Sequence, residues 1–441
     1  MTSRAALATL LITLCSHLAA GQDVLPLDRA VRDGLEHNRA ISAARSGADE
    51  AAARQDEARS RFFPRVSVTE SWQRGDQPVF VFSSLLSARQ FAASNFAIDA
   101  LNHPGPTGFF HGALGIEQLI FDGGRTKAGV DAARLGHEAA SAAVEEASAA
   151  VAFNVTRTYG QLLRAESGQR TLKSAIEAAQ EDVARAERRR DAGMVTEADV
   201  LSLAVHLADL RQRAIQADGD AAILRAQINR LTGAPVTRAF SVQEPAPAGI
   251  DAPMNMETLI AEAEAARPEL KRTAAAVGMA EAGTRQARAA WMPQVAAQAG
   301  YQLDGTRLTT RASSWIVGGE VRWSLSAGGA EAAGARAAAG ALARARSEDA
   351  DARAAVQVDV LTALRHLESA QARQAVAAAA VDQARESQRI IRDRYAAGLA
   401  AVNDVLRAAA ATLDADAQRT ATMVDRLEAG AALVRALGRT P

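Results

Sequence analysis

The residues that most often carry chemistry are sparse in this sequence and lie far apart along it. Two glycine pairs, Gly123-Gly124 and Gly328-Gly329, could cradle a phosphate, but no Lys-Ser or Lys-Thr follows either pair. The Gly-x-Ser-x-Gly pattern of hydrolases and the His-Glu-x-x-His pattern of zinc enzymes are both absent. The histidines beyond residue 21 lack the spacing of a metal site; they are His37, His103, His111, His137, His206 and His366. We therefore expect no enzyme activity, no cofactor and no metal.

Two aspartates stand at matching places and are stronger candidates for a polar function. Asp199 and Asp404 each follow a glycine, Gly193 or Gly398, within a Gly-x-x-x-x-x-Asp-Val-Leu segment. Each aspartate falls in the first turn of an expected helix, where the helix dipole favours a negative charge. A structural role at the helix start therefore explains both residues as well as a functional role does.

These matching segments belong to two copies of one unit. Gly193 and Gly398 lie 205 residues apart, whereas Pro64 and Pro293 lie 229 residues apart. The first copy therefore holds 24 extra residues, which fall between residues 72 and 111. A duplication this regular indicates one structural unit used twice about a pseudo-symmetry axis. A catalytic site would normally break that symmetry.

Composition favours long helices over a compact globular core. Aromatic residues make up 4% of the chain, and alanine is concentrated in polar helical stretches. Alanine-rich helices can pack closely along their lengths. The formal net charge is -1 and both signs are interspersed, so nothing indicates nucleic-acid binding.

The N-terminus has the pattern of an export signal. Arg4 precedes an apolar run over 5–14, and small residues follow at 19–21. Cys15, the single cysteine, lies inside this segment, so the mature chain would have no thiol. No later apolar run reaches the about 20 residues that a transmembrane helix needs. We divide the chain into a signal peptide (1–21), a first repeat (22–234), a Pro-rich linker (235–255) and a second repeat (256–441).

The repeat also organises the expected helices. Helices are expected over 27–61 and 256–290, each ending before a proline, because a proline disfavours a helical conformation in the preceding residue. Thr196 gives one later helix a capping box with Asp199, whereas Ala401 at the matching place cannot cap. Long helices after the glycine pairs and shorter returning helices are expected over 126–190, 330–396, 197–231 and 402–436.

Extended segments follow both prolines and alternate apolar with polar residues. Over 315–325 one face is apolar and the other is mostly polar, and 294–301 has the same pattern. Alternation over about ten residues is typical of a strand that faces lipid. In the first copy, Glu70 and Gln118 interrupt the apolar faces.

Aromatic residues mark the ends of these expected strands. Trp315 and Trp323 lie eight residues apart on one face, which corresponds to roughly 19 Å along the membrane normal for a tilted strand. This spacing is compatible with two aromatic girdles, although a soluble hairpin anchored on the helices would also use tryptophans. The candidate girdle residues are Trp72, Trp291, Tyr301, Trp315 and Trp323.

The number of strands requires several copies of the chain. Four strands cannot close a barrel, and an open sheet edge is costly in lipid. Two, three or four copies would supply eight, twelve or sixteen strands, and the sequence pattern does not determine which number of copies assembles.

The order of these motifs resembles that of the TolC-like outer-membrane efflux channels. The resemblance covers the mature chain and implies a mainly α fold of two tandem repeats with long α-helical hairpins and four β-strands. Three chains would form a twelve-stranded transmembrane β-barrel and a twelve-helix α-barrel. The segments that carry the resemblance are Phe62-Phe63-Pro64, Trp291-Met292-Pro293, Phe121-Asp122-Gly123-Gly124 and the two Gly-x-x-x-x-x-Asp-Val-Leu segments.

The resemblance also implies a function and partners. Such a homotrimer is a passive exit duct in the outer membrane of a Gram-negative bacterium, extends into the periplasm, and serves efflux or type I secretion. It binds a periplasmic adaptor protein and an inner-membrane pump. The pump would select the cargo, which could be drugs, metals or proteins. The alternative is a soluble periplasmic coiled-coil adaptor or scaffold, but the lipid-facing strands favour the channel.

The extra residues of the first copy, over 74–110, are expected to form an external loop. This loop could be a lid, a receptor surface or simply a packed loop.

The resemblance further implies roles at the ends of the helical hairpins. The hairpin tips, 189–195 and 394–400, centred on Gly193-Met194 and Gly398-Leu399, would meet the adaptor. A plain helix C-cap explains the same residues.

A periplasmic gate is implied near the second tip. Asp404 would belong to a ring of carboxylates that closes the entrance and selects cations. Arg407 stands where relatives can carry a second aspartate, so an ion pair between Asp404 and Arg407 is expected to replace part of that ring. Asp199 holds the equivalent position in the first copy.

Overall fold

The computed structural model describes residues 24–245 and 255–439. The expected signal peptide with Cys15, and residues 246–254 of the expected linker, lie outside the described residues. The chain forms two compact units, and each unit combines segments of both repeats. We call them the helical unit (described residues of 1–46, 142–270 and 351–441) and the sheet unit (47–141 and 271–350).

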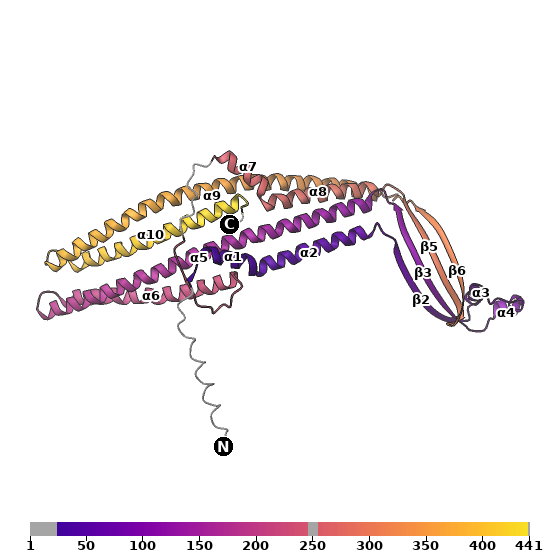
Figure 1. The fold of residues 1–441 in the computed structure, drawn as a ribbon, viewed down its shortest axis with the longest axis horizontal. Coiled ribbons are helices and arrows are strands. Elements are labelled where there is room, and N and C mark those ends of the chain that lie inside the picture. The colour runs from indigo at the N-terminus through magenta and orange to yellow at the C-terminus, as the bar shows by residue number, and fades with distance from the viewer. Residues whose placement is uncertain (1–23, 246–254, 440–441) are drawn as a thin grey trace, which may run out of the picture. The chain divides into compact units, whose positions relative to one another are not determined.

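The two repeats fold into the same helices and strands in the same order (Figure 1). The first repeat contains α1 (Leu27–His37), α2 (Arg39–Ser60), β2 (Arg65–Gly75), β3 (Thr107–Phe121), α5 (Arg125–Asp191) and α6 (Glu197–Leu231). The second contains α7 (Met256–Ala266), α8 (Pro268–Ala289), β5 (Gln294–Arg307), β6 (Thr310–Arg322), α9 (Ala330–Ala396) and α10 (Val402–Ala436).

The expected long and returning helices are confirmed to within one residue at their ends. Helices α5 and α9 have 67 residues each, and α6 and α10 have 35 each. A 67-residue helix is about 100 Å long. None of the helices in the described ranges is apolar over a stretch long enough to cross a membrane.

Both helices that were expected ahead of the prolines are broken in the middle, which corrects that expectation. Asn38 separates α1 from α2, and Arg267 separates α7 from α8, each with an extended backbone. Pro268 causes the second break because it disfavours a helical conformation in the residue before it. At the first break, the Asn38 side chain caps α2 by accepting a hydrogen bond from the Ala40 amide (2.8 Å).

The two break residues also attach the short helices to the returning helices. Asn38 Nδ2 donates to the Leu231 carbonyl at 2.8 Å. Arg267 Nη1 donates to the Ala436 carbonyl at 3.3 Å. Leu231 and Ala436 are 205 residues apart, which is the offset of the repeat. The duplication therefore extends from the sequence to its tertiary contacts, although the donor side chains differ.

Two hairpins, α5 with α6 and α9 with α10, make up most of the helical unit, which contains α5 from residue 142 and α9 from residue 351 (Figure 1). Its main apolar core surrounds the fully buried Tyr159 of α5. The Tyr159 hydroxyl donates to the Leu25 carbonyl (2.9 Å) and accepts from the Gln243 amide (3.1 Å). These bonds hold the parallel pair β1 (Val24–Leu25) and β4 (Ser241–Val242) against α5. The corresponding residue of the second repeat is Leu364, which cannot form such bonds.

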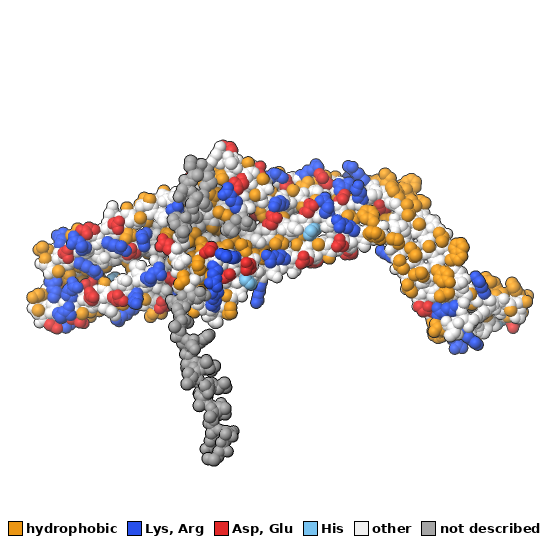
Figure 2. Space-filling view, in the orientation of Figure 1, with side chains coloured by type: hydrophobic (Ala, Val, Ile, Leu, Met, Phe, Trp, Pro, Cys, Tyr) orange, Lys and Arg blue, Asp and Glu red, His pale blue; other side chains and the backbone are white. Residues whose placement is uncertain are grey.

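The sheet unit contains one antiparallel sheet in the order β2-β3-β5-β6. Val68, Leu114, Tyr301 and Trp315 lie in one row across all four strands, so their side chains share a face. We call it the apolar face. It is exposed in the single chain, with Trp315 77% exposed, and hydrophobic side chains gather over the strands in Figure 2. The opposite, polar face carries Ser67, His111, Gln298, Gln302, Asp304 and Glu320.

Glu70, which interrupts the apolar face, is paired across the sheet. Its carboxylate accepts hydrogen bonds from both terminal nitrogens of Arg311 on β6, at 2.9 and 2.8 Å. The pair passes over Gly112, where a Cβ atom would lie 2.8 Å from a Glu70 oxygen. Because the two charges neutralise each other, they can lie on an otherwise apolar face.

The expected strand ends need one correction. Strands β5 and β6 extend further toward their shared turn than the sequence indicated, so Trp315 lies within β6, opposite Tyr301, and not at its end. Trp291 and Trp323 do flank the strands next to α8 and α9, and Trp323 Nε1 donates to the Trp291 carbonyl (3.2 Å). Trp72 lies near the opposite end of β2. The candidate girdle residues therefore occupy three levels along the strands.

The extra residues of the first repeat, expected to form an external loop over 74–110, contain short helices that join β2 to β3. Residues 76–106, here called the insertion, contain α3 (Pro78–Ser87), the 3-10 helix η1 (Ala93–Phe96) and α4 (Ile98–Asn102). The Phe91 ring lies edge-on to Phe82 and Phe96, with centroids 4.7 and 5.0 Å apart. This aromatic cluster gives the insertion a packed structure of its own.

Candidate functional site at the helical tips

The two hairpin turns have the same backbone conformation. Gly193 and Gly398 follow α5 and α9 with φ of +71° and +78°, values that glycine adopts without strain. In both turns the next residue donates its amide to a carbonyl of the last helical turn at 2.8 Å. Both turns are therefore complete helix C-caps. Met194 and Leu399 remain 67% and 70% exposed, so each tip presents one large apolar side chain.

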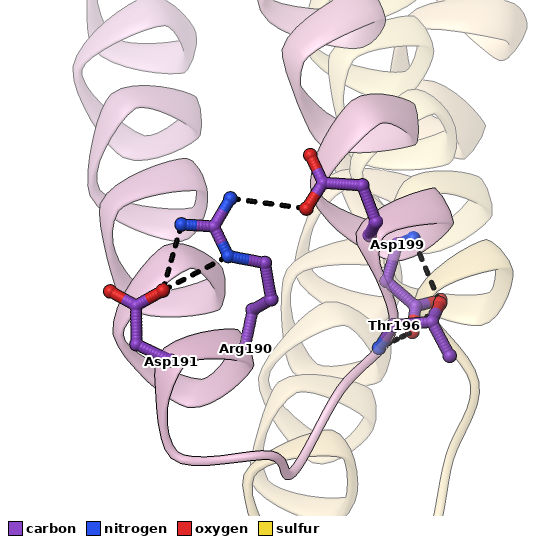
Figure 3. Close-up of polar contacts among 5 residues, drawn as sticks. Arg190, Asp191, Thr196 and Asp199 are labelled. Atoms are coloured by element: carbon purple, nitrogen blue, oxygen red, sulfur yellow. Dashed lines mark hydrogen bonds and ion pairs between the residues drawn. The ribbon is translucent and has the colours of Figure 1, made fainter.

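Charged side chains tie the two helices of the first tip together (Figure 3). Arg190 on α5 donates to the Asp191 carboxylate at 2.8 and 3.0 Å and to Glu197 on α6 at 3.1 Å. The hydrogen bonds that Arg190 donates to the carboxylates of Asp191 and Glu197 raise the pKa of its guanidinium. Tyr395 occupies the corresponding place in the second repeat. The bridge therefore has no counterpart at the second tip.

Both candidate gate aspartates cap the start of a returning helix. Asp199 accepts hydrogen bonds from the amide (3.1 Å) and the hydroxyl (2.8 Å) of Thr196, whose hydroxyl accepts from the Asp199 amide (3.2 Å) (Figure 3). The capping box expected from the sequence is thus confirmed. Asp404 accepts a hydrogen bond from the Ala401 amide (3.2 Å). Ala401 has no side-chain oxygen that could accept one from the Asp404 amide.

The expected ion pair at the second tip is present. Arg407 Nη2 donates to Asp404 Oδ1 at 2.9 Å. The two side chains are 79% and 40% exposed, so the pair contributes little to stability but largely cancels the local charge. Ser202 occupies the place of Arg407 in the first repeat, and Asp199 there has no such arginine.

A contact between the two hairpins, which sequence reasoning missed, lies just behind the tips. The Arg189 guanidinium on α5 lies 5.4 Å from the centroid of the Tyr395 ring on α9, and its Nη1 donates to the Tyr395 carbonyl at 3.2 Å. Further from the tips, Arg392 Nη2 donates to the Asp182 carboxylate at 3.2 Å. We call these four residues the inter-hairpin contact. Tyr395 also packs against a small buried cluster of Ala186, Val200, Leu203 and Val402.

Two polar groups in the inter-hairpin contact are buried without a hydrogen-bond partner. They are the Tyr395 hydroxyl and Arg392 Nε. Burial raises the pKa of Tyr395, and Asp199 adds to the rise while Arg189 opposes it. An unpartnered buried polar group costs about 1–3 kcal/mol. The inter-hairpin contact is therefore held less firmly than its packing alone would allow.

A cleft of about 360 Å³ lies between the hairpins and is lined by residues of α5, α6, α9 and α10. Arg385 of α9 and Asp416 of α10 line one side of it and form an ion pair at 2.9 Å. Burial lowers the pKa of His206, which also lines the cleft. Among the residues that the structure describes, no group of acidic, histidine or cysteine side chains has the arrangement of a metal site.

The sequence matches a known family over both repeats. The model of the family described as outer membrane efflux protein covers residues 30–234 and 259–439. The chain belongs to the outer membrane efflux protein family. As an efflux protein of this family, it is an outer-membrane exit duct of a tripartite efflux system and extends into the periplasm of a Gram-negative bacterium. The soluble adaptor is not favoured.

Solved structures share the fold of this efflux protein at low sequence identity. The CmeC outer membrane channel of Campylobacter jejuni is 18% identical, with a TM-score of 0.82 over 93% of this chain and 85% of that chain. VceC of Vibrio cholerae is 19% identical, with a TM-score of 0.78 over 94% and 96%. The MtrE channel of Neisseria gonorrhoeae, in its open state, is 17% identical, with a TM-score of 0.73 over 94% and 89%. No curated protein sequence matches the chain.

Proposed function

We propose that three copies of this efflux protein assemble in the outer membrane and conduct the substrates of an inner-membrane pump to the outside. Each copy would supply four strands to a twelve-stranded barrel and four long helices to a twelve-helix barrel. The observation that carries this proposal is the exposed apolar face on a sheet whose edge strands, β2 and β6, have no outer partner among the described strands. Pairing β2 of one copy with β6 of the next removes both edges, which lipid would penalise.

The chain itself would catalyse no reaction. The duct is passive, and the pump and its adaptor would choose the cargo and supply the energy. The aromatic residues Trp72, Trp291, Tyr301, Trp315 and Trp323 would contact the lipid region of the membrane, where amphipathic rings are favoured.

The adaptor would bind the hairpin tips. Met194 and Leu399 are exposed apolar side chains on rigid, fully capped turns, which suits them to insert between the helices of a partner. Gly193 and Gly398 would fix the shape of these turns. Replacing Met194 and Leu399 by aspartate should abolish adaptor capture and leave the trimer intact; an undiminished capture would contradict docking through these side chains.

The tips would also form the periplasmic gate. In the closed state the inter-hairpin contact holds α9 against α5, and the adaptor would open the duct by separating them. Asp404 and Arg407 would face the entrance as a nearly neutral pair, and Asp199 would add a carboxylate from the first repeat. Because Arg407 cancels Asp404, the gate would depend on the inter-hairpin contact more than on a ring of negative charge.

The native mass of the protein, extracted by detergent from a purified outer-membrane fraction, tests the assembly. A trimer in that fraction is the expected result. A monomer or dimer recovered from the soluble periplasmic fraction would overturn the duct and favour the adaptor instead. Loss of drug or metal resistance on deletion of the gene, restored by the plasmid-borne chain, would then identify the cargo class.

A further inference from the structure

The insertion of the first repeat is attached to one particular face of the sheet. A Cβ atom on Gly75 would lie 3.6 Å from the Phe80 ring of α3, and that ring lies edge-on to Phe109 with centroids 6.3 Å apart. Gly75 and Phe109 lie on the same side as His111, because alternate residues of a strand share a face and β2 pairs with β3 in register. The insertion therefore covers the polar face, at the end of the strands away from the helices.

Hydrogen bonds also attach the insertion to β5 and β6. Arg89, with a left-handed φ of 52°, donates from Nη2 to the Ser313 carbonyl on β6 at 2.9 Å. The Thr306 hydroxyl on β5 donates to Gln90 Oε1 at 2.7 Å. Three strands thus hold the insertion, from β3 to β6. A non-glycine residue in the left-handed region is strained, so this attachment is specific and not a chance approach of a loop.

The insertion exposes large apolar side chains although it is not on the lipid-facing side. Val79, Phe96 and Ile98 are 80%, 65% and 78% exposed. The charged residues of the insertion are Asp76, Arg89 and Asp99, and Arg89 is already bound to the sheet. Copies of the insertion would therefore repel one another very little.

In a closed ring of sheets, the polar face lines the inside. Three insertions held on that face would then share one mouth, with their exposed apolar side chains in water unless they cover one another. Lipid is on the opposite side of the sheet, so it cannot cover them. Burying them against each other removes apolar surface from water at a small electrostatic cost.

We propose that the insertions of neighbouring copies pack against one another through Val79, Phe96 and Ile98 and narrow the outer mouth of the duct. The partner of this surface is a second copy of this chain. This inference rests on the trimer proposed above and adds a second constriction to the one proposed at the helical tips.

Cross-linking between single cysteines tests the contact. Since Cys15 lies in the expected signal peptide and the chain has no other cysteine, Val79→Cys, Phe96→Cys and Ile98→Cys each introduce one thiol into the mature protein. Treatment of the purified trimer with a short bismaleimide should give cross-linked dimers on a denaturing gel. Val317→Cys is the matched control, because Val317 is 70% exposed on the apolar face and should remain uncross-linked.

Conductance in a planar bilayer tests the constriction. Ile98→Asp places three like charges in the contact, and deletion of 77–105 removes the insertion while keeping β2 and β3; both should raise single-channel conductance, by about twofold or more. A preserved trimer in which none of the three cysteines cross-links, or in which neither variant changes conductance, would overturn this inference alone. Absence of a trimer in the unmodified protein would instead overturn the proposed function.

Discussion

The buried hydroxyl of Tyr395 shows how a single side chain can weaken a contact that must open. Its ring packs in an apolar cluster and against Arg189, yet its hydroxyl has no hydrogen-bond partner. In a purely structural contact, a phenylalanine would serve better at this position, because it would remove the cost of burying the hydroxyl. The tyrosine therefore makes the inter-hairpin contact weaker than a phenylalanine would, which suits a contact that must open.

Replacing Tyr395 by phenylalanine should strengthen the inter-hairpin contact and remove its alkaline sensitivity. Burial raises the pKa of Tyr395 above its ordinary value of 10.0. Because this pKa is raised in the folded state, the contribution of neutral Tyr395 to the stability of the inter-hairpin contact is fully present below pH 10. It is lost as the pH rises through the folded pKa. Single-channel conductance should therefore increase above about pH 10 in the unmodified protein, and this increase should be absent in Tyr395→Phe. An equal alkaline response in both proteins would assign it to other groups.

Sequence reasoning failed at residues whose partners are distant in the chain. Tyr395 and Arg189 both belong to the predicted tip segments, but they lie in different repeats, and no spacing within either repeat indicates that they meet. Glu70 looked like an interruption of a lipid-facing strand because Arg311, which neutralises it, lies 241 residues away. Asp404 and Arg407, three residues apart on one helix, were predicted to pair because that spacing alone brings two side chains together.

At the scale of the element, local signals were sufficient for the helices and insufficient for the strands. Glycine turns at Gly193 and Gly398 and the capping box at Thr196 mark helix ends, so four long helices were predicted almost to the residue. The break at Asn38 was missed because one asparagine within a polar run gives little warning that its side chain will start a new helix. The strands were predicted too short because their far ends are neither clearly apolar nor followed by a strong turn signal.

The unequal caps of α6 and α10 give a paired prediction. The backbone at Thr196 and at Ala401 has the same conformation, φ -85° and ψ 158°. Thr196→Ala should cost about 1 kcal/mol of local stability, and Ala401→Thr should add about the same, because a hydroxyl at this position caps the amide three residues on. Amide hydrogen exchange should become faster at Asp199 in the first variant and slower at Asp404 in the second. Unchanged exchange at Asp404 would show that the second tip cannot use the new cap.

The glycines between strand and helix differ in what surrounds them. Gly123 has φ +68°, and a Cβ atom there would lie 2.6 Å from Met292 Cβ. Gly329 has a similar φ of +71°, but nothing lies within 4 Å of its Cβ position. Gly123→Ala should therefore reduce the yield of folded protein in the outer membrane sharply, whereas Gly329→Ala should cost only about 1 kcal/mol of backbone strain. Equal yields would mean that Met292 can move aside.

At the scale of the whole molecule, duplication fixed the architecture and left each repeat free to differ in detail. Asn38 and Arg267 make the same attachment with different chemistry, while among the described residues the Tyr159 attachment and the insertion belong to the first repeat. In a trimer every such difference appears three times around one axis. A single charged side chain is therefore repeated three times and changes the total charge at the channel entrance.

The pair formed by Asp404 and Arg407 is the clearest test of that multiplication. Arg407→Ser, which copies Ser202 of the first repeat, should leave three uncompensated carboxylates at the entrance and make the channel more selective for cations. The reversal potential in a planar bilayer under a KCl gradient measures this selectivity, and the additional change Asp404→Asn should cancel the shift. Arg365→Ser is the matched control, because Arg365 also forms an ion pair with a carboxylate three residues away, Glu368, and both of these side chains are exposed. If Arg365→Ser shifted the reversal potential as far, the effect would report total charge and Asp404 would have no place in the gate.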